Sequence, residues 1–509
     1  MLRTAPIFAD YMVLQQKKNL YVWGSASPWE CISITIQGKR STAFADENGH
    51  WMAAVAPLEM SFEEKMVISG KKEEICINNV AVGEVWVAAG QSNMEFYMRY
   101  DQDFEKEHLN CHNENIRFFD VPRISYESQM EEEDYSRFGF WRVCDEENLE
   151  YYSAVAYYFA KELQNSYHIP IGIVGCNWGG TSACCWMDYK SAVLSGKIWV
   201  DEYVEALKKC GNYQAYIDKE KKGNAIWKND PFKDPLTERL MYGVSPEETR
   251  KILKKMAESG MFDAPVTPVH PWRPCGLYRT MLKKIVPYSV QGILWYQGES
   301  DAGHAEIYDS VLTRLIQCWR GEWREELPFI MAHVAPYSDG RRFGEIRRAQ
   351  EQVAECINKV YTVATGDVGM KYDLHPKKKG PVGYRMSLIA RHYIYGEDLL
   401  CEAPVPEKWS VFENRVTISM KNAGKGLVME GESLTALKIF DKANVCLSET
   451  AYSVRIEKNR LSIDLKQGSF QEGMKINFAM EDFFQVNLFN SAHIPAKPFS
   501  YVIEGDDKK

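Results

Sequence analysis

The 509-residue sequence lacks several features that would place it in well-defined classes of protein. It has no uninterrupted run of about 18 apolar residues, which a membrane-spanning helix would need. Its first residues contain no apolar segment followed by a small-residue cleavage site, so export by a signal peptide is not expected. Basic residues are not in excess either, because 61 lysines and arginines stand against 70 acidic residues, for a net charge of −9. Binding to nucleic acid is therefore disfavoured.

Paired cysteine and metal-ligand motifs are also missing. The thirteen cysteines stand at irregular spacings without Cys-x-x-Cys pairs, which suits a reducing compartment. Histidines and cysteines do not recur at the spacings of a metal site, and no glycine-rich phosphate loop or dinucleotide fingerprint is present. We therefore expect a cytoplasmic protein that uses no metal ion and no cofactor.

The composition is that of a folded, multidomain protein. Apolar residues make up 45% of the chain and charged residues 26%, as in globular proteins. The length exceeds what one hydrophobic core supports and suggests about three domains.

Hydrophobic periodicity divides the chain into three regions. Residues 1–82 alternate with period two, as in Ile32, Ile34 and Ile36, and Asn48-Gly49 predicts a tight turn, so an N-terminal β domain is expected. Period two returns in residues 401–509, for example at Val416, Ile418 and Met420, which predicts a C-terminal β domain.

Residues 83–400 have the pattern of a parallel sheet covered on both faces, in which short apolar runs alternate with helical stretches. The predicted strands are 82–89, 169–174, 290–296, 329–334 and 360–365, and helices are expected at 153–166 and 307–319. Residues 198–262 form a charged, helix-rich insertion. Its clearest helix begins at Ser245-Pro246-Glu247-Glu248, with the pattern of a capping box.

Three motifs are placed at or beyond the ends of predicted strands. They are Gly90-Gln91-Ser92-Asn93-Met94, Trp295-Tyr296-Gln297-Gly298-Glu299-Ser300 and, near the end of the α/β region, Asp373-Leu374-His375-Pro376. Open α/β sheets bind ligands at the carboxyl ends of their strands, so we expect these motifs to converge. A serine at such a turn can act as a nucleophile if a base and oxyanion donors lie beside it.

The motifs resemble those of a known family. Met94 replaces the second glycine of the Gly-x-Ser-x-Gly elbow, which argues against a lipase-like α/β-hydrolase. Together with Trp178-Gly179-Gly180-Thr181, the motifs resemble the SGNH hydrolases, and among them the sialate O-acetylesterase-like carbohydrate esterases. Phe8-Ala9-Asp10 and residues 423–428 extend the resemblance over most of the chain. It implies an SGNH-type α/β/α catalytic domain with a parallel sheet, flanked by the two β domains.

By that resemblance Ser92 is the nucleophile, His375 the general base and Asp373 the acid that orients the base. The oxyanion hole would combine the Ser92 amide, a glycine amide from Gly179 or Gly180, and the side-chain amide of Gln297. One residue separates Asp373 from His375, whereas many SGNH enzymes have two. Glu299 or a backbone carbonyl is therefore left open as the group that orients His375.

Further residues are expected to contact the substrate. They are Gln91, Asn93, Trp178, Trp295, Glu299 and His304. Aromatic faces suit the C–H faces of sugar rings, but at least two of Trp178, Trp186, Trp295 and Tyr296 are expected to be core residues. Arg347 or Arg348 could pair with the carboxylate of a sialic acid.

The expected activity is hydrolysis of O-acetyl esters on a sugar through an acetyl-serine intermediate. The partner would be a small acetylated sugar or oligosaccharide, derived from sialic acid or from xylo- or manno-oligosaccharides; association with a membrane is not expected, and a homo-oligomer is left open. Two alternatives stay open: a noncatalytic carbohydrate-binding protein with a degenerate hydrolase core, and a thioesterase or peptidase of the same fold.

Overall fold

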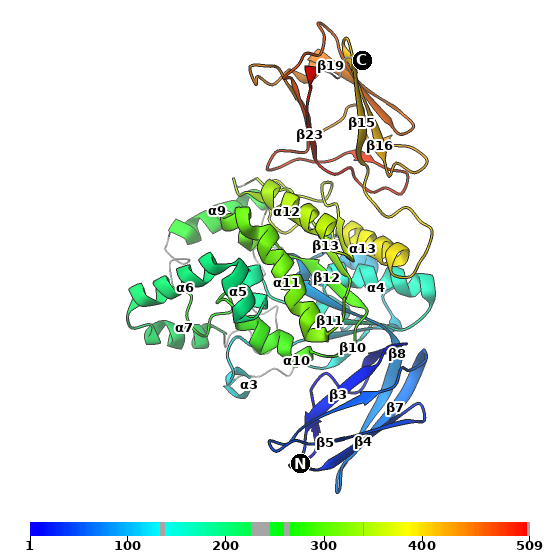
Figure 1. Ribbon diagram of the computed structural model, residues 1–509, viewed down its shortest axis with the longest axis vertical. Helices are drawn as coiled ribbons and strands as arrows, with labels where there is room; N and C mark the ends of the chain where they lie inside the picture. The colour runs from blue at the N-terminus through cyan, green and yellow to red at the C-terminus, as the bar shows by residue number, and fades with distance from the viewer. Residues whose placement is uncertain (133–137, 225–244, 259–264, 339, 506–509) are drawn as a thin grey trace.

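The structure is a computed structural model that describes residues 1–132, 138–224, 245–258, 265–338 and 340–505. Its three regions follow one another along the long axis, with the N-terminal strands at one end, the mixed α/β region in the middle and the C-terminal strands at the other end (Figure 1). None of the helices in the described part of the chain is long and apolar enough to cross a lipid bilayer.

The N-terminal region is built from short strands. They are β1 (Arg3–Thr4), β2 (Val13–Gln15), β3 (Leu20–Ser25), β4 (Cys31–Ile36), β5 (Lys39–Phe44), β6 (His50–Val55) and β7 (Ser61–Ser69). The alternating isoleucines of β4 are all buried, as period two predicts. Gly49 has a φ of 84°, so the turn before β6 uses a conformation that glycine adopts without strain.

Strand β8 (Glu74–Gly90) belongs to both the N-terminal and the central sheet system. Its first half pairs with β7 in antiparallel fashion, and its second half pairs in parallel with β11 (Ile171–Asn177) and β12 (Gly292–Tyr296). The predicted boundary between residues 82 and 83 therefore falls inside one continuous strand. The two regions are joined through its backbone hydrogen bonds and not by a flexible linker.

The central sheet has the order β10-β9-β11-β8-β12-β13-β14. Strand β9 (Asn113–Asp120) runs parallel to β11, and β13 (Phe329–Ala332) and β14 (Val360–Val363) run parallel to each other. The edge strand β10 (Trp141–Cys144) pairs with β9 in antiparallel fashion. The five predicted strands are all present, with ends within three residues of the prediction, except that β8 begins eight residues earlier, at Glu74. Strands β9 and β10 were not predicted, because they carry Arg117 and Arg142 and so lack a continuous apolar run.

Helices cover both faces of this sheet, so the predicted α/β/α arrangement is confirmed. On β8, Val85, Val87 and Ala89 pack into one hydrophobic core while Trp86 and Ala88 pack into the other. The first core includes residues of α11 (Tyr308–Trp323) and α12 (Phe343–Cys356), and the second includes residues of α4 (Ala154–Tyr167) and α13 (Gly380–Tyr393). The predicted helices at 153–166 and 307–319 correspond to α4 and α11.

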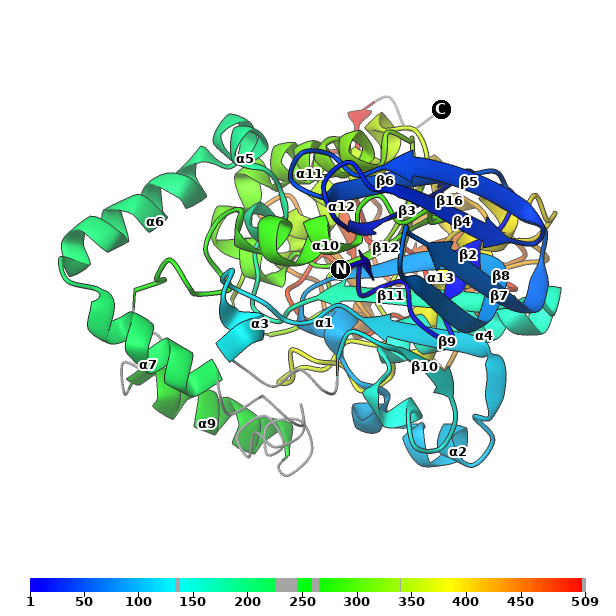
Figure 2. The same ribbon diagram turned by 90° about the horizontal axis from the view of Figure 1, so that it is seen from below.

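The predicted insertion contains helices that stand to one side of the sheet (Figure 2). After α5 (Tyr189–Ser195) come α6 (Lys197–Cys210), α7 (Gln214–Asn224) and α9 (Pro246–Glu258). The capping box is present, because Glu248 N–H donates to Ser245 Oγ and Ser245 N–H donates to the Glu248 carboxylate. Residues 225–244 and 259–262 of this segment lie outside the described residues.

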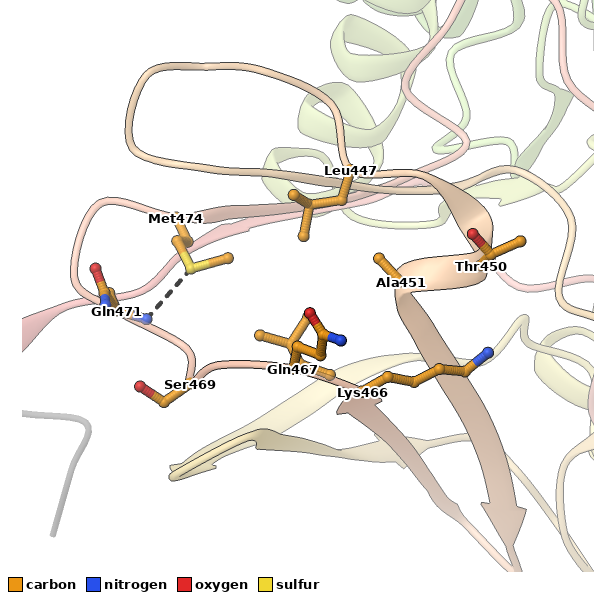
Figure 3. A pocket seen from close by; sticks show the side chains of 9 residues that line it. Leu447, Thr450, Ala451, Lys466, Gln467, Ser469, Gln471 and Met474 are labelled. Carbon is orange, nitrogen blue, oxygen red and sulfur yellow. Dashed lines mark hydrogen bonds between the residues drawn. The ribbon is translucent and has the colours of Figure 1, made fainter.

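The C-terminal region has a hydrophobic core of its own. Its strands are β15 (Val405–Phe412), β16 (Arg415–Lys421), β17 (Val428–Met429), β18 (Leu437–Phe440), β19 (Tyr452–Glu457), β20 (Arg460–Leu465), β21 (Lys475–Phe478), β22 (Leu488–Phe489) and β23 (Phe499–Val502). A pocket of about 480 Å³ lies in this region, beside Leu447, Lys466 and Met474 (Figure 3). Lys466 is the one charged residue that lines it.

The C-terminal region also supports the central sheet. Val486 N–H donates to the carbonyl of Gly366 at 3.0 Å, and the side chain of Gln485 donates to the carbonyl of Gly369. Both glycines lie between β14 and α13, in the segment that leads to Asp373 and His375. The two flanking β regions therefore brace opposite parts of the central region.

Candidate active site

Ser92 stands at a sharp turn between β8 and the short helix α1 (Ser92–Glu95). Gly90 ends the strand with a φ of 137°, and a Cβ atom at this position would lie 2.1 Å from the carbonyl oxygen of Tyr296. Only glycine fits here. The turn is then fixed because the carbonyl of Gln91 accepts the N–H groups of Met94 and Glu95. The strand and the turn together hold Ser92 at the carboxyl edge of the sheet.

His375 lies beside Ser92. It comes from the segment between β14 and α13, and its Nε2 atom is 2.8 Å from Ser92 Oγ. At this distance the hydroxyl of Ser92 can donate its proton to a neutral imidazole. The two residues are 283 positions apart in the chain, so the sheet brings them together.

Asp373 contacts the backbone of His375 more closely than its ring. Oδ1 of Asp373 accepts the backbone N–H of His375 at 2.8 Å but lies 4.0 Å from ring atom Nδ1, too far for a hydrogen bond. Oδ2 forms an ion pair with Lys377 Nζ at 3.0 Å. Asp373 therefore holds the loop in shape and places a buried negative charge near the imidazole.

The environment of His375 favours its neutral form. Burial lowers the pKa of His375 to about 3, Asp373 opposes this shift, and the positive charges of Lys377 and Lys379 add to it. An imidazole with this pKa is unprotonated at neutral pH, as a general base must be before it accepts a proton.

A buried polar network lies behind the Ser92–His375 pair. The side-chain amide of Asn93 donates to the Glu299 carboxylate at 2.6 Å and to the backbone carbonyl of Leu374 at 3.2 Å, and it accepts from Lys379 Nζ at 2.6 Å. Burial raises the pKa of Glu299 and lowers the pKa of Lys379 to about 7. Because Leu374 precedes His375, this network ties the nucleophile turn to the loop of the base.

Gln91 and Gln297 connect the strand ends on the other side of Ser92. The side-chain carbonyl of Gln91 accepts hydrogen bonds from the backbone amides of Gly298 and Ser300, at 3.3 and 3.2 Å. Gln297 is fully buried, and its Nε2 atom lies within 3.2 Å of acceptors on Gln91, Thr181 and Asp301. Both hydrogens of this amide are engaged within the protein. Its role as an oxyanion donor stays a prediction that this geometry does not favour.

The glycine turn after β11 lies against Ser92. A Cβ atom at Gly179 would stand 3.2 Å from the Cβ of Ser92. The N–H of Gly179 donates to Glu95 Oε2 at 2.6 Å, and the other oxygen of Glu95 pairs with Arg123 at 2.9 Å. Gly180 N–H has no protein acceptor among the described residues, so it is the better placed of the two glycines to bind a ligand oxygen.

Burial corrects several of the predicted substrate contacts. Trp295 is fully buried and packs edge-on against Trp319, so it is a core residue and cannot contact a sugar. Trp186 and Tyr296 are equally buried, and only Trp178 of the predicted aromatic residues is partly exposed. Gln91, Asn93 and Glu299 are buried as well and act through the networks described above.

Two of the three predicted charged contacts bind other parts of the protein. His304 lies 3.0 Å from a carboxylate oxygen of Glu202 and edge-on to Trp199, on the insertion. Arg347 is buried, donates to the carbonyl of Val334 and lies over the ring of Phe484, so it cannot pair with a sialate carboxylate. Arg348 is exposed.

The sequence analysis did not predict three residues of the site: Glu95, Lys377 and Lys379. Only Glu95 had a usable signal, because it lies three positions after the serine. The two lysines belong to Lys377-Lys378-Lys379, a run that is typical of a solvated surface, yet Lys379 is buried. Within the described residues, no three His, Cys, Asp or Glu side chains come together as a set that could hold a metal ion.

A parallel sheet with helices on both faces and a serine–histidine pair at its carboxyl edge is typical of serine hydrolases. Residues 266–388, which include the Gln297 and His375 motifs, match the family model of the carbohydrate esterases described as sialic acid-specific acetylesterases. The predicted resemblance to the sialate O-acetylesterase-like carbohydrate esterases is thereby confirmed.

Comparisons that cover most of the chain agree with this match. The chain is 25% identical over 452 residues to the sialate O-acetylesterase of Mus musculus, which covers 80% of this chain and 76% of the mouse protein. The human sialate O-acetylesterase is 24% identical over 458 residues, with 81% and 76% covered. The crystal structure of a carbohydrate acetylesterase from Xanthomonas citri has the same fold, with a TM-score of 0.74, 24% identity and coverage of 98% of this chain and 99% of that chain.

Proposed function

We propose that the protein is a carbohydrate O-acetylesterase that removes acetyl groups from sugar hydroxyls through an acetyl-serine intermediate. The observation that carries the proposal is the 2.8 Å contact between His375 Nε2 and Ser92 Oγ at the carboxyl edge of the sheet. The similarity to proteins named sialate O-acetylesterase supports an esterase and the acetyl group as the acyl part of the substrate.

In the proposed reaction His375 removes the proton of Ser92 as the hydroxyl oxygen attacks the acetyl carbon. The imidazolium then returns this proton to the oxygen of the departing sugar. Water, deprotonated by the same imidazole, then attacks the acetyl-serine. The imidazolium returns this proton to Ser92 Oγ as the ester bond breaks, and acetate and free Ser92 result. Asp373 stabilises the imidazolium by its charge, and Asn93 holds the loop of the base through the carbonyl of Leu374.

The negative oxygen of the tetrahedral intermediates requires fixed donors. We assign this role to the backbone amides of Ser92 and Gly180. The turn that carries Gly180 is held in place, because Thr181 Oγ1 donates to the carbonyl of Trp178 at 2.7 Å and accepts from the indole of Trp186 at 2.9 Å. Glu95 fixes Gly179 in the same turn.

Hydrolysis of 4-nitrophenyl esters tests the acyl preference. We expect kcat/KM to be highest for the acetate and to fall steeply for the butyrate and octanoate. The sugar is then tested by acetate release from acetylated sialic acids and acetylated xylo-oligosaccharides, measured in parallel. A preference for long acyl chains, or activity on thioesters or peptides with no release of acetate from any sugar, would contradict the proposal.

The pH dependence follows from the low pKa of His375. Because the base loses its function when it is protonated, kcat/KM should stay level as the pH falls through 6.5 and decline only as it approaches about 3. Lys377→Met removes a positive charge that lowers this pKa. The acidic limb should therefore move to higher pH, by roughly one unit.

The matched control is Lys378→Met, which removes the same charge from an exposed neighbour. Its acidic limb should lie close to that of the wild type. An equal shift in both variants, or none in Lys377→Met, would show that Lys377 does not set the pKa of the base.

A further inference from the structure

Trp272 differs from the other tryptophans near the site in its exposure. It is 42% exposed, whereas Trp186 and Trp295 are fully buried. It lies in the segment between α9 and the helical turn Tyr278–Leu282, and it belongs to none of the motifs that follow a strand. Because the indole is buried only on one side, its other side is available to a ligand.

The ring of Trp272 lies directly on the glycine turn beside Ser92. Its indole N–H donates to the carbonyl of Gly179 at 3.2 Å. A Cβ atom at Gly180 would lie 2.6 Å from the ring, so the backbone approaches the indole as closely as only glycine allows. Gly179 in turn lies against Ser92. The exposed indole is therefore separated from the proposed nucleophile by a single layer of backbone.

The conformation of Trp272 is fixed before any ligand binds. Its backbone N–H donates to His270 Nδ1 at 3.1 Å, and the His270 ring lies edge-on to the indole with centroids 4.9 Å apart. Cys185 Sγ donates to the carbonyl of Trp272 at 3.3 Å. Pro271 and Pro274 restrict the backbone on both sides. A ring held in this way loses little conformational entropy when a ligand stacks on it.

We propose that Trp272 is the stacking platform for the sugar ring whose acetyl ester is cleaved at Ser92. This assignment rests on the proposed function. An exposed indole presents a flat apolar surface to the axial C–H groups of a pyranose and leaves the hydroxyl groups at the ring edge in water. The platform would select for a sugar ring next to the ester, which a simple alkyl acetate lacks.

The test compares Trp272→Ala with Trp272→Phe, using an acetylated xylo-oligosaccharide and 4-nitrophenyl acetate as substrates. Trp272→Ala should raise KM for the sugar substrate on the order of tenfold with a much smaller change in kcat. The effect on 4-nitrophenyl acetate should be several-fold weaker. Trp272→Phe keeps an aromatic face without the bond to Gly179 and should recover most of the lost affinity. The matched control is Trp29→Ala, at a 70% exposed tryptophan of the N-terminal region. It should leave KM and kcat unchanged for both substrates.

Two results would overturn the platform. If kcat falls equally for both substrates and Trp272→Phe does not recover it, Trp272 only supports the glycine turn. If neither constant changes, the sugar does not touch it. A calorimetric experiment separates this inference from the proposed function: it measures binding of the acetylated xylo-oligosaccharide to Ser92→Ala, with and without Trp272→Ala. Loss of binding with Trp272→Ala supports the platform even if the wild type releases no acetate. Equal binding to the two variants refutes it.

Discussion

Replacing Ser92 with alanine should abolish esterase activity while leaving the fold intact. The hydroxyl oxygen is the only atom removed from the protein, and in the proposed reaction it forms the covalent bond to the acetyl group. Ser92 is partly exposed at the end of β8, so no cavity is created in the core. We expect a loss of roughly 10⁶-fold in kcat, as for other hydrolases in which the nucleophile or base is removed. Initial rates with 4-nitrophenyl acetate measure it.

His375→Ala should be about as damaging as Ser92→Ala, and the double variant should be barely worse than either. Residues that act as one unit are strongly non-additive, and the 2.8 Å contact between the two side chains is the structural basis for such a unit. Additive losses in the double variant would mean that the two residues act in separate steps. Unchanged melting temperatures of the three variants serve as the control for folding.

Covalent labelling provides an independent check of the nucleophile. A serine-directed organophosphate should modify the wild-type protein once, and the modified peptide should contain Ser92. Modification of His375→Ala should be much slower, because the base that activates the hydroxyl is missing. A label on a peptide without Ser92 would refute the assignment.

The strand-end positions of the motifs could be predicted from the sequence because buried parallel strands leave continuous apolar runs. Val85 to Ala89 and Ile293 to Tyr296 are such runs, and the motifs that contain Ser92 and Gln297 follow them directly. Parallel pairing of β8 with β12 then brings Ser92 and Gln297 to the same edge. The extent of β8 could not be predicted, since its first half pairs with a different sheet and has a different periodicity.

The roles of polar residues around the serine depend on tertiary contacts that no local pattern contains. Lys379 lies in a run of lysines, yet its ammonium group is buried against Asn93, from a segment 286 positions away. The sequence alone does not distinguish Trp272 from Trp295, but Trp272 is exposed over the glycine turn and Trp295 is in the core. The cytoplasmic location and the two domain boundaries stay predictions.

Two carboxylates, those of Asp373 and Glu299, could support the imidazole of His375, and the structure favours Asp373. Glu299 is buried and bonds to Asn93, and it reaches the base only through Asn93 and the carbonyl of Leu374. Asp373 lies 4.0 Å from ring atom Nδ1, where the charge interaction with the imidazolium is about 4 kcal/mol at an effective dielectric constant of 20. A small rotation in the substrate complex would add a direct hydrogen bond.

Asp373→Asn should therefore lower kcat on the order of 10³-fold, because the negative charge that stabilises the imidazolium is lost. The amide oxygen of the asparagine can still accept the backbone N–H of His375, so the loop should keep its shape. Glu299→Gln is the matched control: it also turns a buried carboxyl into an amide beside the site, and its oxygen can still accept from Asn93. We expect it to cost roughly tenfold or less. If Asp373→Asn leaves kcat nearly unchanged and Glu299→Gln lowers it strongly, the supporting role belongs to Glu299. The charge would then act on the base through the Asn93 network.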